Sequence, residues 1–226
     1  MARQARIVVP HIPHHVTQRG NRGEAIFFEK GDEDIYLDLL SRETSRREVE
    51  VWAYCLMPNH VHLILTPQTT EGLGLAIGEA HRRYTNFVNV RGGWTGHLFQ
   101  SRFASVAMDE DHLLAAVRYG ALNPVRAGLA SRAADWPWSS VRAHLAGIDD
   151  ALVRVAPLLA RTDRFEDLLK NQTDADVVAF RALRTAEKTG RPVGSKAFID
   201  QVELRLGRVF GPRKRGRKPK TVEPAA

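Results

Sequence analysis

The stretch VEVWAYCLMPNHVHLILT, residues 49–66, has the pattern of two strands joined by a tight turn. Residues 49–56 are rich in β-branched and aromatic side chains, and residues 60–66 form a second apolar run. Pro58 and Asn59 between them are turn formers. We therefore predict a β-hairpin here, with its second strand starting at a histidine.

Two histidines interrupt the apolar run of the second strand. Side chains at positions i and i+2 project from the same face of a strand, so His60 and His62 point together while Val61 enters the opposite layer. Two imidazoles on one face can bind one divalent cation. A pair of partly buried, hydrogen-bonded histidines fits the pattern equally well. If a metal is bound, a third ligand must come from elsewhere in the fold.

Strand and helix patterns alternate on both sides of this hairpin. Residues 14–28 predict a strand, a turn at residues 19–21 and a return, and residues 103–108 a short strand. Helical periodicity covers residues 32–47, 73–90 and 110–122. The order β, α, β, β, α, β, α predicts an α+β fold, with a ferredoxin-like antiparallel sheet and helices packed on one face.

Particular residues mark the expected helix ends and core positions. Asp32 is placed to cap the first helix, and Pro124 disfavours helical geometry at Asn123, where the third predicted helix should end. Tyr84 lies in the middle of a helix at an apolar spacing and is expected in the core. The aromatic turn at residues 136–140 is expected to pack, with a serine able to cap a short helix.

The chain divides by composition into three parts. Residues 1–147 carry the α+β pattern and form the predicted main domain, which contains the candidate metal-binding pair His60 and His62. Residues 148–190 are more polar and predict a helical extension. Residues 191–226 end in the charged stretch PRKRGRKPK and predict a basic DNA-binding tail.

Composition favours an anionic partner. The 226 residues include 33 Lys and Arg against 26 Asp and Glu, a net charge of +7, with 43% hydrophobic residues, enough for a core. Nucleic acid is the first expected partner and a membrane surface the second, although a basic soluble protein without a polyanion fits as well. One cysteine, Cys55, excludes an internal disulfide. Without an apolar run long enough to span a bilayer, we expect a cytoplasmic protein.

A third metal ligand is available on the last predicted helix. In VRYGALNPVRAG, residues 117–128, Tyr119 and Asn123 are four positions apart and share one helical face. If this helix crosses the sheet face that carries the histidines, Asn123 would supply an oxygen and Tyr119 would stand beside it. Two imidazoles and one oxygen, with positions left for water and phosphate, suit Mg²⁺ or Mn²⁺. The alternative is that Tyr119 is a core aromatic residue and that Asn123 is an ordinary residue at the end of the helix.

Four motifs occur in a familiar order: HVTQRGNRGEAIFF, YCLMPNHVHLIL, GHLFQSRF and RYGALNPVRAGL. Together they resemble the REP-associated tyrosine transposases, a branch of the HUH, IS200-like transposases of single-stranded DNA. The resemblance implies that His60 and His62 bind the metal and that Tyr119 is the nucleophile. It also implies that Asn123 completes the coordination, where mobile relatives usually carry Gln.

The resemblance also implies an activity and its partners. The expected protein is a metal-dependent endonuclease and strand transferase that cleaves near hairpins through a 5′-phosphotyrosine intermediate. Its partner would be single-stranded DNA with imperfect palindromic hairpins, and the protein would act as a monomer or homodimer. The alternative function is a catalytically inactive regulator that binds hairpin DNA or RNA without cutting it.

Basic residues in and near these motifs are candidates for DNA contacts. Arg19, Arg102 and Arg118 belong to the core motifs, and Arg102 is the strongest candidate for a phosphate. In the tail, Arg215, Arg217 and Lys218 lie in a segment that resembles a loose AT-hook. A tail that only binds phosphates nonspecifically or keeps the protein soluble is the alternative.

Overall fold

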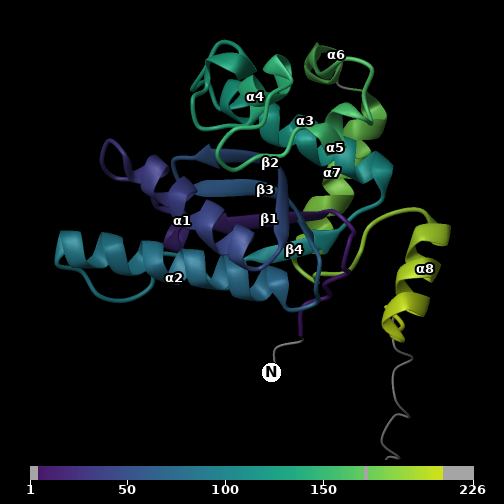
Figure 1. Ribbon diagram of the computed structural model, residues 1–226, viewed down its shortest axis with the longest axis horizontal. Coiled ribbons are helices and arrows are strands. Elements are labelled where there is room, and N and C mark those ends of the chain that lie inside the picture. Colours follow the sequence, from purple (N-terminus) through teal and green to yellow (C-terminus); the bar gives the residue numbers. More distant parts are fainter. Residues whose placement is uncertain (1–4, 171–172, 211–226) are drawn as a thin grey trace, which may run out of the picture.

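A four-stranded antiparallel sheet lies at the centre of the computed structural model, which describes residues 5–170 and 173–210 (Figure 1). The strands follow the order β2-β3-β1-β4, and each neighbouring pair is antiparallel. Their bounds are β1 His14–Arg19, β2 Val49–Met57, β3 His60–Pro67 and β4 Ala104–Ala107. The predicted hairpin is confirmed as β2 and β3, joined by Pro58 and Asn59.

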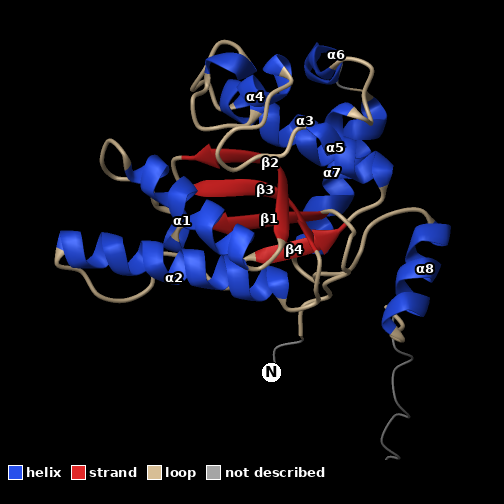
Figure 2. Cartoon of the chain, in the orientation of Figure 1, coloured by secondary structure: helices blue, strands red, loops and turns tan. Residues whose placement is uncertain are grey.

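Helices cover both faces of this sheet (Figure 2). On one face, Val16, Val61 and Leu63 pack with α1 (Asp32–Arg46) and α2 (Gly72–Gly92). On the other, Ile64 and Val106 pack with α3 (Glu110–Arg126) and α7 (Asp174–Glu187). The predicted α+β class and antiparallel sheet are confirmed. The predicted packing of helices on one face holds for α1 and α2, and the second face carries its own apolar layer under α3 and α7.

The segment after β1 does not return as a strand. It forms a 3-10 turn, η1 (Asn21–Gly23), and β1 pairs with β3 and β4 instead. Gly20 makes an isolated bridge to Phe99 at the start of this turn. A Cβ atom on Gly20 would overlap the carbonyl oxygen of Glu24, so the turn that brings Glu24 back against Gly20 requires glycine.

Two predicted helix ends differ from the structure. Gly31, with φ of 97°, precedes α1, and Asp32 is its first residue rather than its cap. Helix α3 continues past Asn123 and includes Pro124. Proline removes only its own bond to the carbonyl four residues earlier. Since the Ala127 N–H donates to the Asn123 carbonyl at 3.0 Å, the last turn still closes.

The aromatic turn at residues 136–140 covers the edge of the sheet that β2 forms. The Leu56 N–H of β2 donates to the Trp138 carbonyl at 2.8 Å, and the Ser140 N–H donates to the Tyr54 carbonyl at 3.0 Å. The Trp136 indole donates to the Leu56 carbonyl at 2.9 Å. The predicted packing role is confirmed, and it protects an edge that would otherwise be open to pairing with another chain.

The remaining helices follow α3 along the chain. They are η2 Ala133–Asp135, α4 Val141–Ala146, α5 Ala156–Leu159, α6 Phe165–Lys170 and α8 Lys196–Leu206. Helix α7 packs along α3, whereas α8 packs near the start of the chain through Val202 against Ile7 and Val9. In the described part of the chain, no helix has the length and apolar character needed to cross a bilayer.

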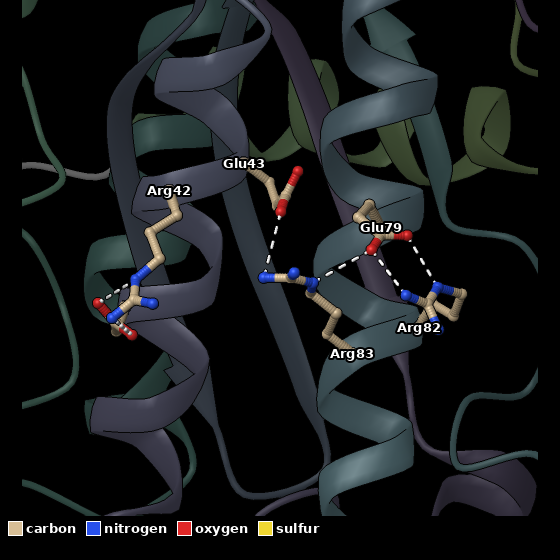
Figure 3. A network of polar contacts seen from close by, with 6 residues as sticks. Arg42, Glu43, Glu79, Arg82 and Arg83 are labelled. Atoms are coloured by element: carbon tan, nitrogen blue, oxygen red, sulfur yellow. Dashed lines mark hydrogen bonds and ion pairs between the residues drawn. The ribbon is translucent and has the colours of Figure 1, made fainter.

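Ion pairs link α1 and α2 outside the apolar layer. Arg83 on α2 lies 3.6 Å from Glu43 on α1 and 3.1 Å from Glu79, and Glu79 also pairs with Arg82 at 2.7 Å (Figure 3). Pairs as exposed as that of Arg82 contribute little to stability, because solvent screens them. Arg82 and Arg83 are therefore held by acidic side chains at the surface of α1 and α2.

A buried ion pair closes the start of α1. The fully buried Asp32 carboxylate accepts hydrogen bonds from Arg91 at 2.6 and 2.9 Å and from the backbone N–H groups of Phe28 and Glu29. Burial alone would raise the pKa of Asp32. The bonds from Arg91 and from the two N–H groups outweigh it, and the pKa lies below its usual value.

We expect the substitution Asp32→Ala to lower the free energy of unfolding by about 1–3 kcal/mol, since it removes the acceptor of the Phe28 and Glu29 N–H groups. Because the folded-state pKa is depressed, the stabilisation is complete above the unfolded-state pKa of about 4. It is lost as the pH falls through the lower folded value. Urea titrations at pH 7 and pH 3 measure both effects. Asp38→Ala, which removes an exposed pair with Arg42, is the control, and an equal loss in both variants would contradict the prediction.

Candidate active site

The register between β1 and β3 gathers polar side chains on one face of the sheet. Thr17 pairs with His62 and Arg19 pairs with His60. Residues directly opposite each other in an antiparallel pair share a face. Val61, between the two histidines, is buried in the layer under α1 and α2. The histidines of β3 therefore project toward α3, together with alternate residues of β1.

Helix α3 brings two further side chains to these histidines. The Asn123 side-chain amide nitrogen lies 3.1 Å from Nε2 of His60. One turn earlier, the Tyr119 ring lies 5.6 Å from the His62 ring between centroids, with the planes at 71°. The structure thus brings together the four residues His60, His62, Tyr119 and Asn123.

Three of these four residues, all but Asn123, border a cavity of about 270 Å³. Both histidines and Tyr119 line it, and the segment before β4 contributes Gln100 and Arg102. The other lining residues come from β1 and α7 and include Gln18, Arg19, Phe180, Arg184 and Glu187. Because three of these side chains are arginines, the cavity suits an anionic ligand.

Burial keeps the two histidines neutral. It lowers the pKa of His60 to about 4, with further lowering by the charges of Arg19 and Arg184. Burial also lowers the pKa of His62 well below its usual value, and the neighbouring His15 and His60 lower it further. A neutral imidazole carries a lone pair and is the form that binds a metal.

The hydrogen bonds of His60 leave one ring nitrogen available. Its Nδ1 lies 2.6 Å from Oδ1 of Asn59, which can only accept. Nδ1 therefore carries the proton, and the lone pair of Nε2 faces Asn123. Such an outer partner is what fixes the tautomer of a metal-binding histidine.

The side chains that would hold a divalent cation here are His60, His62 and, as a third ligand, Asn123, which lies 3.1 Å from His60. Within residues 5–170 and 173–210, no three His, Cys, Asp or Glu side chains converge as a metal site. A third protein donor of another type is therefore needed beside His60 and His62. Rotating the Asn123 amide by half a turn would present its oxygen instead of its nitrogen at the same place.

Sequence reasoning missed a second polar layer behind the site. Nε2 of the fully buried His15 lies 3.0 Å from Nδ1 of His62, and Nδ1 of His15 lies 3.6 Å from Glu187. Phe180 of α7 stacks on Tyr119 with ring centroids 3.3 Å apart. Two patterns could have found them: alternation of His15 with Thr17 along a strand, and the spacing of Phe180 and Glu187 on one helical face.

The predicted DNA-binding residues separate in space. Arg19 and Arg102 line the cavity. Arg118 does not, because its guanidinium pairs with Asp176 of α7 and donates to the Leu168 carbonyl. Tyr84 is fully buried and donates to the Ile26 carbonyl at 2.8 Å, so its predicted place in the core is confirmed. Arg215, Arg217 and Lys218 lie outside the described residues.

Comparisons with known proteins point in the same direction as the geometry. A family model described as transposase IS200-like matches residues 8–119, a range that includes both histidines and ends at Tyr119. The solved structure of a REP-associated tyrosine transposase bound to a REP hairpin is 20% identical, with a TM-score of 0.56. The match covers 69% of this chain and 93% of that chain.

A second structure, of a transposase candidate from Deinococcus radiodurans R1, is 21% identical with a TM-score of 0.37. That match covers 48% of this chain and 88% of that chain. No curated protein matches the sequence. The fold is therefore that of the REP-associated tyrosine transposase, and residues 8–119 match the IS200-like transposase family model.

Proposed function

We propose that this protein cleaves and rejoins single-stranded DNA beside imperfect palindromic hairpins, with Tyr119 as the nucleophile. The observation that carries the proposal is the meeting of Tyr119 with His60 and His62 at one cavity, although they come from different elements. The hairpin as partner is extended from the matching REP-associated transposase, whose structure contains one.

The proposed reaction exchanges one phosphate ester for another. The Tyr119 hydroxyl oxygen bonds to phosphorus while the bond from phosphorus to the 3′ oxygen breaks. The phenol proton is given up and the departing oxygen leaves as a 3′-hydroxyl, so the strand end stays attached as a 5′-phosphotyrosine. A second 3′-hydroxyl can reverse the step, which restores Tyr119 and joins the strands without a nucleoside triphosphate.

The side chains around the cavity would hold the phosphate for this attack. His60, His62 and Asn123 would bind Mg²⁺ or Mn²⁺, which when bound would draw charge from a phosphate oxygen. Arg19 and Arg102 add positive charge at the same cavity. Phe180 and Arg126 lie on the Tyr119 ring, at 3.3 and 4.5 Å, and restrict its movement.

We expect Tyr119→Phe to abolish the covalent protein–DNA adduct and to leave hairpin binding within about twofold, since only the attacking oxygen is removed. Labelled single-stranded hairpins from the flanks of the encoding gene, incubated with Mn²⁺, would be scored on denaturing gels for adduct and on native gels for binding.

Tyr84→Phe is the matched control, because it removes a tyrosine hydroxyl from the core and should keep the adduct. An adduct of full yield in the Tyr119 variant would refute the assignment. Hairpin binding without an adduct in the wild-type protein would instead support the inactive regulator.

We expect Asn123→Ala to raise the Mn²⁺ concentration needed for half-maximal adduct by about 10- to 100-fold, because one of three protein ligands is lost. The yield should recover at high Mn²⁺. Asn89→Ala, at a partly exposed position of α2 whose side chain donates to the Gly96 carbonyl, is the control. An unchanged Mn²⁺ requirement in the Asn123 variant would exclude it as a ligand.

A further inference from the structure

A line of three polar side chains runs from α7 to the floor of the cavity. Glu187 Oε1 lies 3.6 Å from Nδ1 of His15, and Nε2 of His15 lies 3.0 Å from Nδ1 of His62. The two imidazole rings are nearly parallel, with an interplanar angle of 3°. His62 is the predicted metal ligand, the buried His15 lies behind it, and Glu187 also lines the cavity.

The burial of His15 determines which of its ring nitrogens carries the proton. The His15 side chain is fully buried, and its Nδ1 has no hydrogen-bond partner within the described residues. A buried polar atom without a partner is costly, and here it faces the carboxylate of Glu187. Since a carboxylate only accepts, the favoured arrangement places the His15 proton on Nδ1.

The position of that proton decides the state of His62. With Nδ1 of His15 protonated, its Nε2 is an acceptor, so the bond at 3.0 Å requires a proton on Nδ1 of His62. The Nε2 lone pair of His62 is then open. If the two tautomers were reversed, His15 would donate and Nε2 of His62 would carry the proton, which would block a metal.

We propose that His15 and Glu187 are positioning residues that hold His62 with its Nε2 lone pair free to bind the metal. The inference deepens the proposed function and rests on it for the identity of the ligand. Its support is the geometry of the metal-free protein. Thr17 donates to Glu187 and Phe180 packs edge-on against His15 at 6.1 Å, so both positioning residues are themselves held in place.

The tautomer is directly measurable by NMR on the full-length, metal-free protein labelled with ¹⁵N-histidine. Long-range ¹H–¹⁵N correlations distinguish a protonated Nδ1 from a protonated Nε2, and a His62→Gln variant identifies the His62 signals. We expect His62 to be protonated on Nδ1 in the wild-type protein. A wild-type His62 protonated on Nε2 would overturn the inference.

Three variants test the positioning role. His15→Phe keeps a planar ring but removes the acceptor, so His62 should lose its single tautomer and Mn²⁺ affinity should fall by about 10- to 100-fold. His15→Gln restores an acceptor oxygen and should recover most of both. Glu187→Ala acts from the partly exposed helix α7, where the fold is less at risk, and should shift the His15 and His62 tautomers.

His144→Phe is the matched control, because His144 is also buried but stacks on Phe165, and should leave His62 unchanged. Unaltered His62 tautomers in both His15→Phe and Glu187→Ala would overturn the inference. The proposed function is judged separately, by Mn²⁺ binding to the wild-type protein. A correct tautomer without any Mn²⁺ binding would support the positioning role and refute the metal-dependent mechanism.

Discussion

The antiparallel register between β1 and β3 is the constraint on which the candidate site depends. It sets Arg19 beside His60 and Thr17 beside His62. A shift by one residue would turn every side chain of a strand to the opposite face. Val61 would then leave the apolar layer under α1 and α2, where it is fully buried. The packing of that layer therefore holds the histidines toward α3.

Neutral imidazoles and positive guanidinium groups have different roles at this cavity. The buried histidines lack charge, so they offer lone pairs instead of repelling a cation. Arg19, Arg102 and Arg184 surround them and suit a polyanionic strand. The difference in charge follows from how deeply each group is buried. The imidazoles lie against the sheet, whereas the arginines extend from the ends of its strands and from α7.

Periodicity was sufficient for the parts of the site that are local in sequence. The alternation at His60 and His62 and the four-residue step from Tyr119 to Asn123 each predict a shared face, and α3 lies where the prediction required. The helix ended later than Pro124 suggested, because packing on the sheet outweighs one lost hydrogen bond. The contact of Glu187 with His15 joins segments far apart in the chain, which no local pattern describes.

Helix α7 has a consequence for the timing of activity during synthesis. The strands that bear the histidines and the helix that bears Tyr119 all precede it in the chain. Folding on the ribosome proceeds from the N-terminus, so a nascent protein would place Tyr119 beside the histidines before the wall that contains Phe180 and Glu187 exists. Chains released before α7 is made would have an open, unsupported pocket, and the proposed activity would become possible only once α7 has been synthesised.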